Sequence, residues 1–393
     1  MNKFIKDPVY NDFLKFSSDE LKLIDLPEFK RLKKIKQLGA LDEVFPNANH
    51  SRFSHSLGVA HLSEQYFKNI LKNSNIDNKF IKHVKIAGLY HDIGHGPFSH
   101  VFDNVVLKKI CPNNPYSKHE YRSQIIFENL IKKININNFS GYDIDIIKNM
   151  INPITHKSYY YNQIVNNTIN SLDTDKIDYL MRDSYQLGFK YSFDYRKLFN
   201  KTKLISTDNS NNQIYYHENE ANNIFDIFYT RYKFHREIYN HKTVKSIELM
   251  ISDILLMSND IYDFQTAIQT DDFFDLDDNI LTRIKYNSEK KLNKCRTILN
   301  RIDTRNLYKE IYKTCNYDIS FVTDYIQDTY SDNNINDFHI IKLNFDLCNG
   351  SLSPLENINF YKNNNEIIDN NNIFIRKIIP KNFDESFIAV YKK

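Results

Sequence analysis

The segment His91-Asp-Ile-Gly-His-Gly-Pro-Phe-Ser-His100 decides how this 393-residue chain is interpreted. The ten residues before it, 81–90, carry apolar side chains at helical spacing and predict a buried helix. Glycine and proline inside the segment then end the helix and turn the chain. His91 and Asp92 therefore lie side by side at a helix end, where an imidazole and a carboxylate can bind a divalent metal if partners join them.

A single His-Asp pair is weak evidence for a metal, because both side chains can instead hydrogen-bond to the backbone at a helix end. Three histidines within these ten residues argue against that purely structural interpretation. Two other segments offer partners. His55 lies near the start of a helix predicted from apolar spacing over 59–70, and Asp175 lies on another predicted helix.

On the helix that carries Asp175, the side chains of Asp175, Tyr179 and Asp183 share one face at i, i+4 and i+8. Such a stripe fits either a solvated surface or the lining of a metal–phosphate site. Together with His55 and the His91-Asp92 pair, Asp175 supplies a set of two imidazoles and two carboxylates. This set suits Mn, Fe, Zn or Mg and leaves coordination positions for water and substrate. Sequence order alone does not show that the four residues meet in space.

The composition is that of a globular protein without a marked charge. Apolar residues make up 41% of the chain, and its 28 Phe and 27 Tyr can fill a large core. A net charge of +3 is too small to argue for a nucleic-acid partner. The four dispersed cysteines form no CxxC pair and fit reduced thiols. Without an apolar leader or a membrane-spanning run, we expect an intracellular protein, cytoplasmic by default, although the sequence does not exclude the nucleus.

Helical patterns dominate most of the chain, and the pattern changes near its end. Pro27–Leu38 is predicted as one helix, and residues 285–315 as another that includes Arg305. Alternating apolar residues predict strands at 340–347, 373–378 and 387–391. We therefore expect a mainly α protein with a helical core over residues 1–315 and a small α+β region over residues 316–393.

The order of a histidine, a later His-Asp pair and a distant aspartate resembles the HD superfamily of metal-dependent phosphohydrolases. Within that superfamily, the chain resembles the SAM-and-HD-domain dNTP triphosphohydrolases of vertebrates and their bacterial relatives. The resemblance covers almost the whole chain, with no room for the extra sterile-alpha-motif domain. The matching stretches are 35–39, 52–59, 86–103, 173–179, 182–183, 230–242, 298–307 and 389–393.

The resemblance implies an HD-domain helical core with one divalent metal, Mn, Fe, Zn or Mg, and Mg bound with the nucleotide. The implied metal ligands are His55, His91, Asp92 and Asp175. The implied catalytic residues are His95, His100 and His119, which line the phosphates, and Asp103, which orients His100. The implied reaction is attack of metal-activated water at the α-phosphorus of a dNTP, which gives a deoxynucleoside and triphosphate. A metal lowers the pKa of bound water toward about 7, and a histidine can protonate the departing 5′-oxygen.

The resemblance also implies a set of substrate contacts. Donors to the triphosphate are Arg52, Lys176, Tyr179 and Arg231. Gln37 and Asp183 match the residues that hold the sugar 3′-hydroxyl. Leu38 and Tyr239 match the packing that leaves no space for a 2′-hydroxyl. His235 completes the set, since it follows Arg231 and precedes Tyr239 at helical spacing.

The family's nucleotide-activator sites are only partly matched. The matching residues are Asp25, Arg305, His241 and Lys242. Lys30 and Lys33, however, stand where the family has Gln and Arg, and a lysine does not replace a planar guanidinium at a nucleotide base. We therefore expect GTP control to be weakened, altered or absent. A homo-oligomer, dimer or tetramer, is implied by the resemblance.

Two alternatives to a dNTP triphosphohydrolase remain open. One is an HD phosphohydrolase that acts on another nucleotide, such as a nucleoside monophosphate or a cyclic nucleotide. The other is a nucleic-acid-binding or regulatory protein that uses an HD fold. The intact set of metal ligands favours an enzyme, and the sequence shows no clustered basic and aromatic surface to support nucleic-acid binding.

Overall fold

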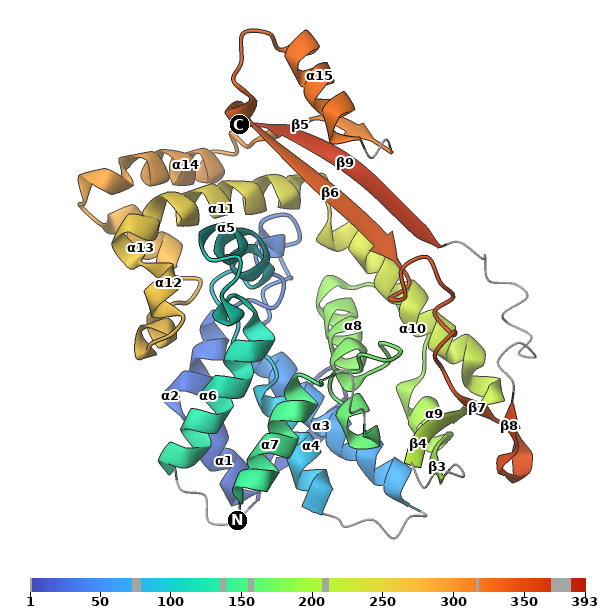
Figure 1. Cartoon of the computed structure of the whole chain (residues 1–393). Helices are drawn as coiled ribbons and strands as arrows, with labels where there is room; N and C mark the ends of the chain where they lie inside the picture. The colour runs from blue at the N-terminus through green and yellow to red at the C-terminus, as the bar shows by residue number, and fades with distance from the viewer. Residues whose placement is uncertain are drawn as a thin grey trace.

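The computed structural model describes residues 2–72, 79–134, 139–154, 159–206, 212–315, 318–368 and 383–393. The predicted strand at 373–378 lies outside these residues. Helices form the body of the molecule, and strands from the C-terminal part form a long ribbon beside it (Figure 1). The expected mainly α architecture with a small α+β C-terminal region is confirmed. No helix in the described part of the chain has both the length and the apolar character of a membrane span.

Three helices form the centre of the fold: α3 (Arg52–Leu71), α4 (Lys79–Tyr90) and α8 (Thr174–Leu187). Helix α3 lies between the other two, and glycines permit both contacts. A Cβ atom on Gly88 of α4 would lie 2.9 Å from Ala60 Cα of α3. A Cβ atom on Gly58 of α3 would lie 1.9 Å from a carboxylate oxygen of Asp178 on α8. Close packing at these two glycines brings the C-terminal end of α4 and the first turns of α8 close to the start of α3.

The other long helices complete the helical body, some packed on this centre and some on one another (Figure 1). They are α6 (His119–Ile134), α7 (Gly141–Ile151), α10 (Ala221–Phe234), α11 (Lys242–Tyr262) and α14 (Asn293–Asp303). Two π-helical turns, Phe102–Leu107 and His235–Tyr239, lie next to α5 and α10. The shorter helices are α1 (Ser18–Ile24), α2 (Pro27–Lys30), α5 (Lys108–Ile110), α9 (Tyr195–Asn200), α12 (Phe264–Ala267), α13 (Ile280–Tyr286) and α15 (Ile319–Thr329).

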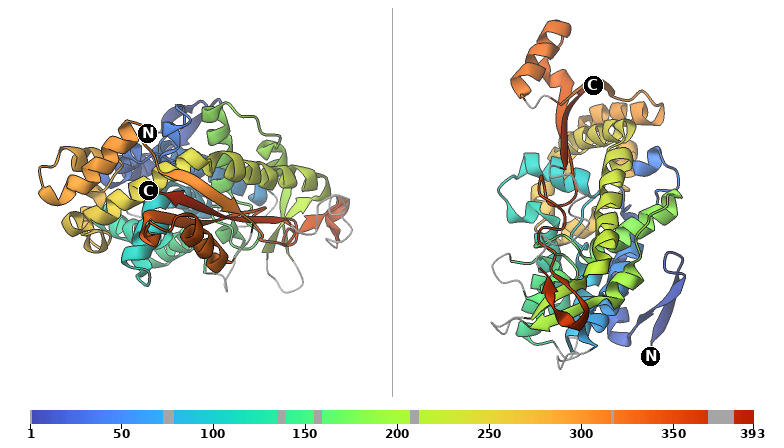
Figure 2. Two further views of the ribbon diagram at one scale, coloured as in Figure 1. Left: turned by 90° about the horizontal axis from the view of Figure 1, so that it is seen from above. Right: turned by 90° about the vertical axis from the view of Figure 1, so that its right-hand side faces the viewer.

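The strands form three small sheets. An antiparallel hairpin joins β1 (Lys3–Asp7) and β2 (Asp12–Phe16). A four-stranded sheet has the order β3 (Thr202–Ser206), β4 (Asn212–His217), β7 (Phe360–Tyr361) and β8 (Ile367–Ile368). The third sheet is antiparallel and has the order β5 (Lys309–Thr314), β9 (Asp384–Lys392) and β6 (Phe338–Asp346). Figure 2 shows α15 standing beyond the helical body, at the end where the chain finishes.

The third sheet connects the two predicted regions of the chain. Strand β5, which precedes residue 315, pairs with β9, which follows it. Apolar side chains of the C-terminal region, including Phe345 and Tyr391, belong to the same hydrophobic core as the helices. The division at residue 315 remains a prediction, and the sheet crosses it.

Two predicted helices are shorter in the structure than in the sequence analysis. Helix α2 ends at Lys30 and passes into a 3-10 turn over Arg31–Lys34, after which Lys36 bridges to Ser51. Helix α14 ends at Asp303, and Arg305 has a left-handed backbone with φ of 58°. The long-range β5–β9 pairing then takes residues that local periodicity assigned to a helix, because pairing partners distant in sequence leave no periodic signal.

We predict that Gly88→Ala lowers the free energy of unfolding by about 1–3 kcal/mol, because the new methyl group meets the α3 backbone and the two helices must separate. Chemical denaturation followed by circular dichroism measures this change. Gly141→Ala is the matched control, since nothing lies within 4 Å of the added Cβ. The control should leave stability unchanged or raise it by roughly 0.5–1 kcal/mol. Equal stabilities of the two variants would contradict the close α3–α4 contact.

Candidate active site

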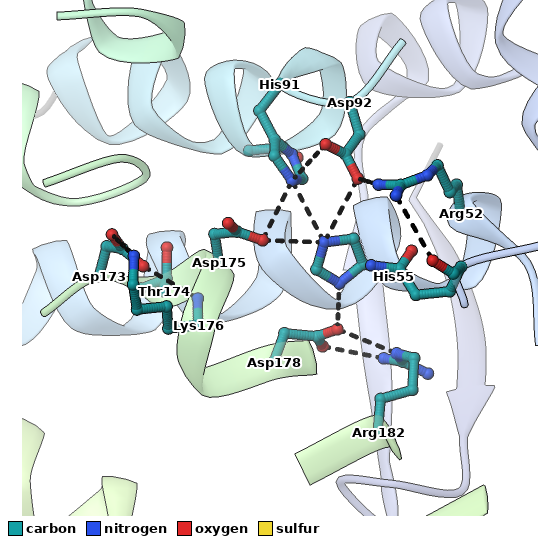
Figure 3. Close-up of polar contacts among 12 residues, drawn as sticks. Arg52, His55, His91, Asp92, Asp173, Thr174, Asp175, Lys176, Asp178 and Arg182 are labelled. Atoms are coloured by element: carbon teal, nitrogen blue, oxygen red, sulfur yellow. Dashed lines mark hydrogen bonds and ion pairs between the residues drawn. The ribbon is translucent and has the colours of Figure 1, made fainter. Parts of the chain in front are cut away.

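The four predicted metal ligands converge where α3, α4 and α8 meet (Figure 3). His55 lies in the first turn of α3, His91 directly follows α4, and Asp175 lies in the first turn of α8. Nε2 of His55 lies 3.2 Å from Nε2 of His91 and 3.0 Å from a carboxylate oxygen of Asp175. The same oxygen lies 3.4 Å from Nε2 of His91. Three donor atoms from three helices therefore surround one point.

Asp92 closes the fourth side of this group. Its two carboxylate oxygens lie 3.6 Å from Nε2 of His55 and 3.4 Å from Nε2 of His91. The guanidinium of Arg52 also donates to Asp92. Burial opposes the charge on Asp92, but Arg52 and the neighbouring histidines outweigh it and hold the pKa of this carboxyl well below its usual range. Asp92 is therefore a carboxylate, as metal ligation requires.

The outer ring nitrogens of both histidines are already engaged. Nδ1 of His91 donates to the Gly88 carbonyl at 2.8 Å, and Nδ1 of His55 donates to Asp178 at 2.7 Å. In neutral imidazoles this leaves an unprotonated Nε2 on each ring, and the two lone pairs face each other. Positive charge between the rings removes the conflict. Ligands roughly 2.1 Å from a shared cation lie about 3 Å apart, so the observed separations fit a divalent metal.

Two acids beside His55, Asp175 and Asp178, also favour positive charge at this point. Burial alone would lower the pKa of His55, but hydrogen bonds with Asp175 and Asp178 outweigh it and raise the pKa to about 10. Asp178 is fully buried and bonds to Arg182 through both oxygens, at 2.9 and 3.0 Å. Tyr10 also donates to Asp178. The sequence analysis missed Asp178 as a site residue, although its i, i+4 spacing to Arg182 is a local signal of an ion pair.

A cluster of histidines adjoins the metal-ligand group. The rings of His95 and His119 stack with centroids 3.7 Å apart, and the His100 ring lies edge-on to His95 at 5.4 Å. Nδ1 of His95 bonds to Asp103 at 2.8 Å. Nε2 of His95 lies 3.4 Å from Asp92. The donor atoms of Asp92, His95 and His119 also lie within 4.8 Å of one another, so they form a second group able to hold a metal.

The partner of Asp103 differs from the expectation. Asp103 bonds to His95 and to the guanidinium of Arg122, and no hydrogen bond among the described residues joins it to His100. Both oxygens of Asp103 are already engaged, because Nδ1 of His95 donates to one of them and the Arg122 guanidinium donates to the other. Arg122, fully buried on α6, was not anticipated from the sequence.

Two of the predicted phosphate-binding residues, Lys176 and Arg231, are paired with acids. Nζ of Lys176 lies 3.0 Å from Asp173, the N-cap residue of α8. The Arg231 guanidinium contacts both the carbonyl and the side chain of Asp346, at 3.2 and 3.4 Å. Asp346 ends β6, so the C-terminal region reaches the cleft. Burial raises the pKa of Tyr179, and the nearby cations Arg231 and Lys176 offset only part of this effect. The hydroxyl therefore stays protonated and can donate.

The residues predicted to contact the sugar form a second part of the cleft. Asp183 is fully buried, accepts from the Tyr239 hydroxyl and lies 2.8 Å from Nε2 of His50. The side-chain oxygen of Gln37 is buried and has no hydrogen-bond partner among the described residues. His235 lies edge-on to Tyr239 at 5.1 Å. The sequence analysis did not include His50, because this histidine belongs to no recognisable motif. Leu38 is half-buried and follows Gln37 in sequence.

Of the four residues matched to activator sites, Arg305 and His241 contact the segment Glu43–Phe45, and Lys242 follows His241 in sequence. Arg305 bonds to Glu43 at 3.2 Å, and the His241 ring lies 6.0 Å from the Phe45 ring. Lys242 follows His241 at the start of α11. Asp25 lies apart, paired with Lys30 at 2.9 Å. Two of the four charges, those of Asp25 and Arg305, are thus matched inside the chain.

Comparison with known proteins agrees with this geometry. The HD domain family matches residues 52–183, a range that runs from the start of α3 through the first three turns of α8. Deoxynucleoside triphosphate triphosphohydrolase SAMHD1 of Bos taurus is 32% identical over 447 residues, covering 100% of this chain and 75% of the relative. The human protein of the same name is 31% identical and covers 100% and 70%.

A viral relative gives the same assignment. Putative HD domain-containing protein L394 of Acanthamoeba polyphaga mimivirus is 38% identical over 331 residues, covering 76% of this chain and 71% of the relative. The similarity to the SAMHD1 proteins includes both the metal-ligand group and the C-terminal sheet, because it extends over the full chain. The chain therefore belongs to the SAMHD1 family of HD-domain proteins.

Proposed function

We propose that the protein is a metal-dependent hydrolase that converts a dNTP and water into a deoxynucleoside and triphosphate. The observation that carries the proposal is the pair of imidazole Nε2 atoms 3.2 Å apart, flanked by two carboxylates and opening on a cleft with cationic donors. The names of the SAMHD1 relatives, which are deoxynucleoside triphosphate triphosphohydrolases, support the substrate class. Phosphoryl chemistry needs charge neutralisation and positioning, and this arrangement offers both.

The metal would be held by His55, His91, Asp92 and Asp175, and Mn, Fe, Zn and Mg all suit this donor set. When bound, a divalent cation supplies Lewis acidity and makes hydroxide available near neutral pH. A further Mg would accompany the nucleotide, whose phosphates bind it well. Asp178 and the Gly88 carbonyl hold the two rings in the orientation that binding requires.

The departing 5′-oxygen needs a proton, and the structure favours His95 as its source. Asp103 accepts from Nδ1 of His95 and fixes its tautomer, so Nε2 is the atom that exchanges a proton with the cleft. Burial lowers the pKa of the half-buried His119, and the neighbouring His95 lowers it further, so the His119 ring is neutral at physiological pH. The His100 ring beside it is exposed. We assign both rings to hydrogen bonds with phosphate oxygens.

The triphosphate would bind to Lys176, Arg231, Tyr179 and Arg52. These residues supply charge-assisted hydrogen bonds to a group with four negative charges. Asp173 and Asp346 partly neutralise two of these cations. Bound phosphate oxygens would replace the half-buried Asp346 contact more easily than the buried Asp173 contact, because Asp173 is also tied to backbone amides.

The sugar would lie against Gln37, Leu38, Asp183, Tyr239 and His235. The partnerless oxygen of Gln37 can accept a hydrogen bond from a 3′-hydroxyl, which removes the cost of an unsatisfied buried acceptor. Tyr239 is tied to Asp183 and cannot swing away freely, so its ring limits the space beside the sugar. We assign the preference for deoxyribose to the fixed position of the Tyr239 ring.

Product analysis tests the proposal directly. Purified protein incubated with each dNTP in the presence of Mn or Mg should yield deoxynucleoside and intact triphosphate, separated by ion-exchange chromatography, and the same incubations with each rNTP should yield little or no nucleoside. A His91→Ala/Asp92→Ala variant should yield neither. Release of orthophosphate or monophosphate would instead indicate an HD phosphohydrolase acting on another bond. If no nucleotide is hydrolysed with any metal, salt-dependent oligonucleotide binding would test a nucleic-acid-binding role.

We predict that Asp178→Asn weakens metal binding about 10–100-fold, because the His55 ring loses the negatively charged acceptor that raises its basicity. Titration with Mn, followed by electron paramagnetic resonance of the free ion, measures this without any turnover. Asp145→Asn, which changes an exposed acid on α7, should bind Mn like the wild type. Unchanged Mn affinity in the Asp178 variant would separate this carboxylate from the metal site.

We further predict that GTP changes the rate of dNTP hydrolysis by less than about twofold, because Lys30 and Glu43 already occupy the charges of Asp25 and Arg305. Initial rates measured over a GTP titration test this. Sedimentation velocity with and without GTP shows whether the proposed dimer or tetramer depends on nucleotide. Strong, saturable activation would overturn the prediction and restore these residues as an activator site.

A further inference from the structure

Two consecutive residues immediately before His100 have a left-handed backbone. Phe98 has φ of 55° and Ser99 has φ of 52°, and neither is glycine. This conformation is unfavourable for residues with a Cβ, and for a bulky residue such as Phe98 it persists only when the surroundings enforce it. The turn reverses the chain between His95 and His100, so it sets where the His100 ring lies.

One half-buried carboxylate, that of Asp278, contributes to that enforcement. Asp278 accepts the backbone N–H of Phe98 at 2.7 Å with one oxygen and the backbone N–H of Lys36 at 2.8 Å with the other. Its own N–H donates to the Lys34 carbonyl at 3.3 Å. Asp278 thus joins the strained turn to the segment before α3, although it lies 180 residues from Phe98 in sequence.

The segment around Asp278 supports the preceding part of the loop as well. Arg31 donates to the carbonyls of Leu276 and His95, both at 2.8 Å. The Arg31 guanidinium lies 4.3 Å from the centre of the Phe273 ring, and the Arg122 guanidinium lies 5.3 Å from it on the same aromatic. Arg122 donates in turn to the Gly94 carbonyl at 2.7 Å. Residues 273–278 therefore contact the loop His91–His100, directly at Phe98 and through the side chain of Arg31 at His95.

Ser99 connects the turn with the metal-ligand group. Its hydroxyl accepts from Nε of Arg52 at 2.7 Å and donates to the Lys36 carbonyl at 3.3 Å. Arg52 also donates to Asp92. Asp278 and Ser99 thus bind the same residue, Lys36, through its N–H and its carbonyl, and the left-handed turn is fixed from both sides.

We propose that Asp278 is a positioning residue for His100. By accepting the Phe98 N–H it holds the left-handed turn that directs the His100 ring toward His95 and the cleft. The proposal deepens the function proposed above and rests on it, since His100 is assigned there to the phosphates. An aspartate suits this role because both its oxygens accept, whereas an asparagine would set an amide N–H against one of the two backbone N–H groups.

The test uses two neighbouring acids of the full-length protein. Asp278→Asn should lower kcat for a dNTP about tenfold or more, with KM within about twofold and bound metal unchanged, because ground-state contacts remain while the catalytic geometry is lost. Asp278→Glu, which keeps both acceptor oxygens, should recover part of kcat. Asp277→Asn is the control. Asp277 is buried and bonds to Asn279, Arg283 and Lys34, and no hydrogen bond among the described residues joins it to the turn.

Histidine ring NMR separates this proposal from the proposed function. In protein labelled at the imidazole carbons, the His100 signal should shift in Asp278→Asn and stay in place in Asp277→Asn. Lack of turnover by the wild type would overturn the proposed reaction alone, and the NMR comparison would still decide the role of Asp278. An unmoved His100 signal, or an equal loss of kcat in the two variants, would overturn the positioning role. If Asp278→Asn does not fold, the signal of Asp278→Ala, which removes both acceptor oxygens, is read in the same way.

Discussion

Two imidazole nitrogens face each other at 3.2 Å, and the rest of the structure depends on holding them there. The rings can stay in place only with positive charge between them, and neither ring can rotate away. The Gly88 carbonyl holds His91, and Asp178 holds His55. The distance between the rings depends on the close contact of α3 and α4, which a side chain at Gly88 would prevent. Helix packing and metal-site geometry are therefore one constraint.

Buried charges surround this pair, and each is matched. Asp178 is paired with Arg182, Asp92 with Arg52, and Asp103 with Arg122. Such pairs are costly to desolvate, and well-packed apolar residues would often give equal or greater stability. Their persistence around the cleft is better explained by geometry, because each arginine fixes a carboxylate that in turn orients a histidine or joins the metal-ligand group.

The C-terminal region contributes to the cleft as well as to the core. Strand β6 ends at Asp346, which contacts Arg231 across from the metal-ligand group, and β9 joins β6 to β5. In the segment between α12 and α13, Asp278 accepts the backbone N–H of Phe98 in the loop His91–His100. Parts of the chain far from the His91–His100 segment in sequence thus define its shape, and a nucleotide would meet residues from all of them.

The sequence by itself determined the helical class, two C-terminal strands, at 340–347 and 387–391, and the residue types of the metal-ligand group, because periodicity and the His-Asp spacing are local signals. It also suggested the family. Only the tertiary structure showed that Asp103 bonds to His95, and that His50, Arg122, Asp178 and Asp278 bond to residues of the candidate site or its supporting turn. It alone showed that 309–314 is a strand. These features depend on contacts between residues distant in sequence, which leave no local pattern to read.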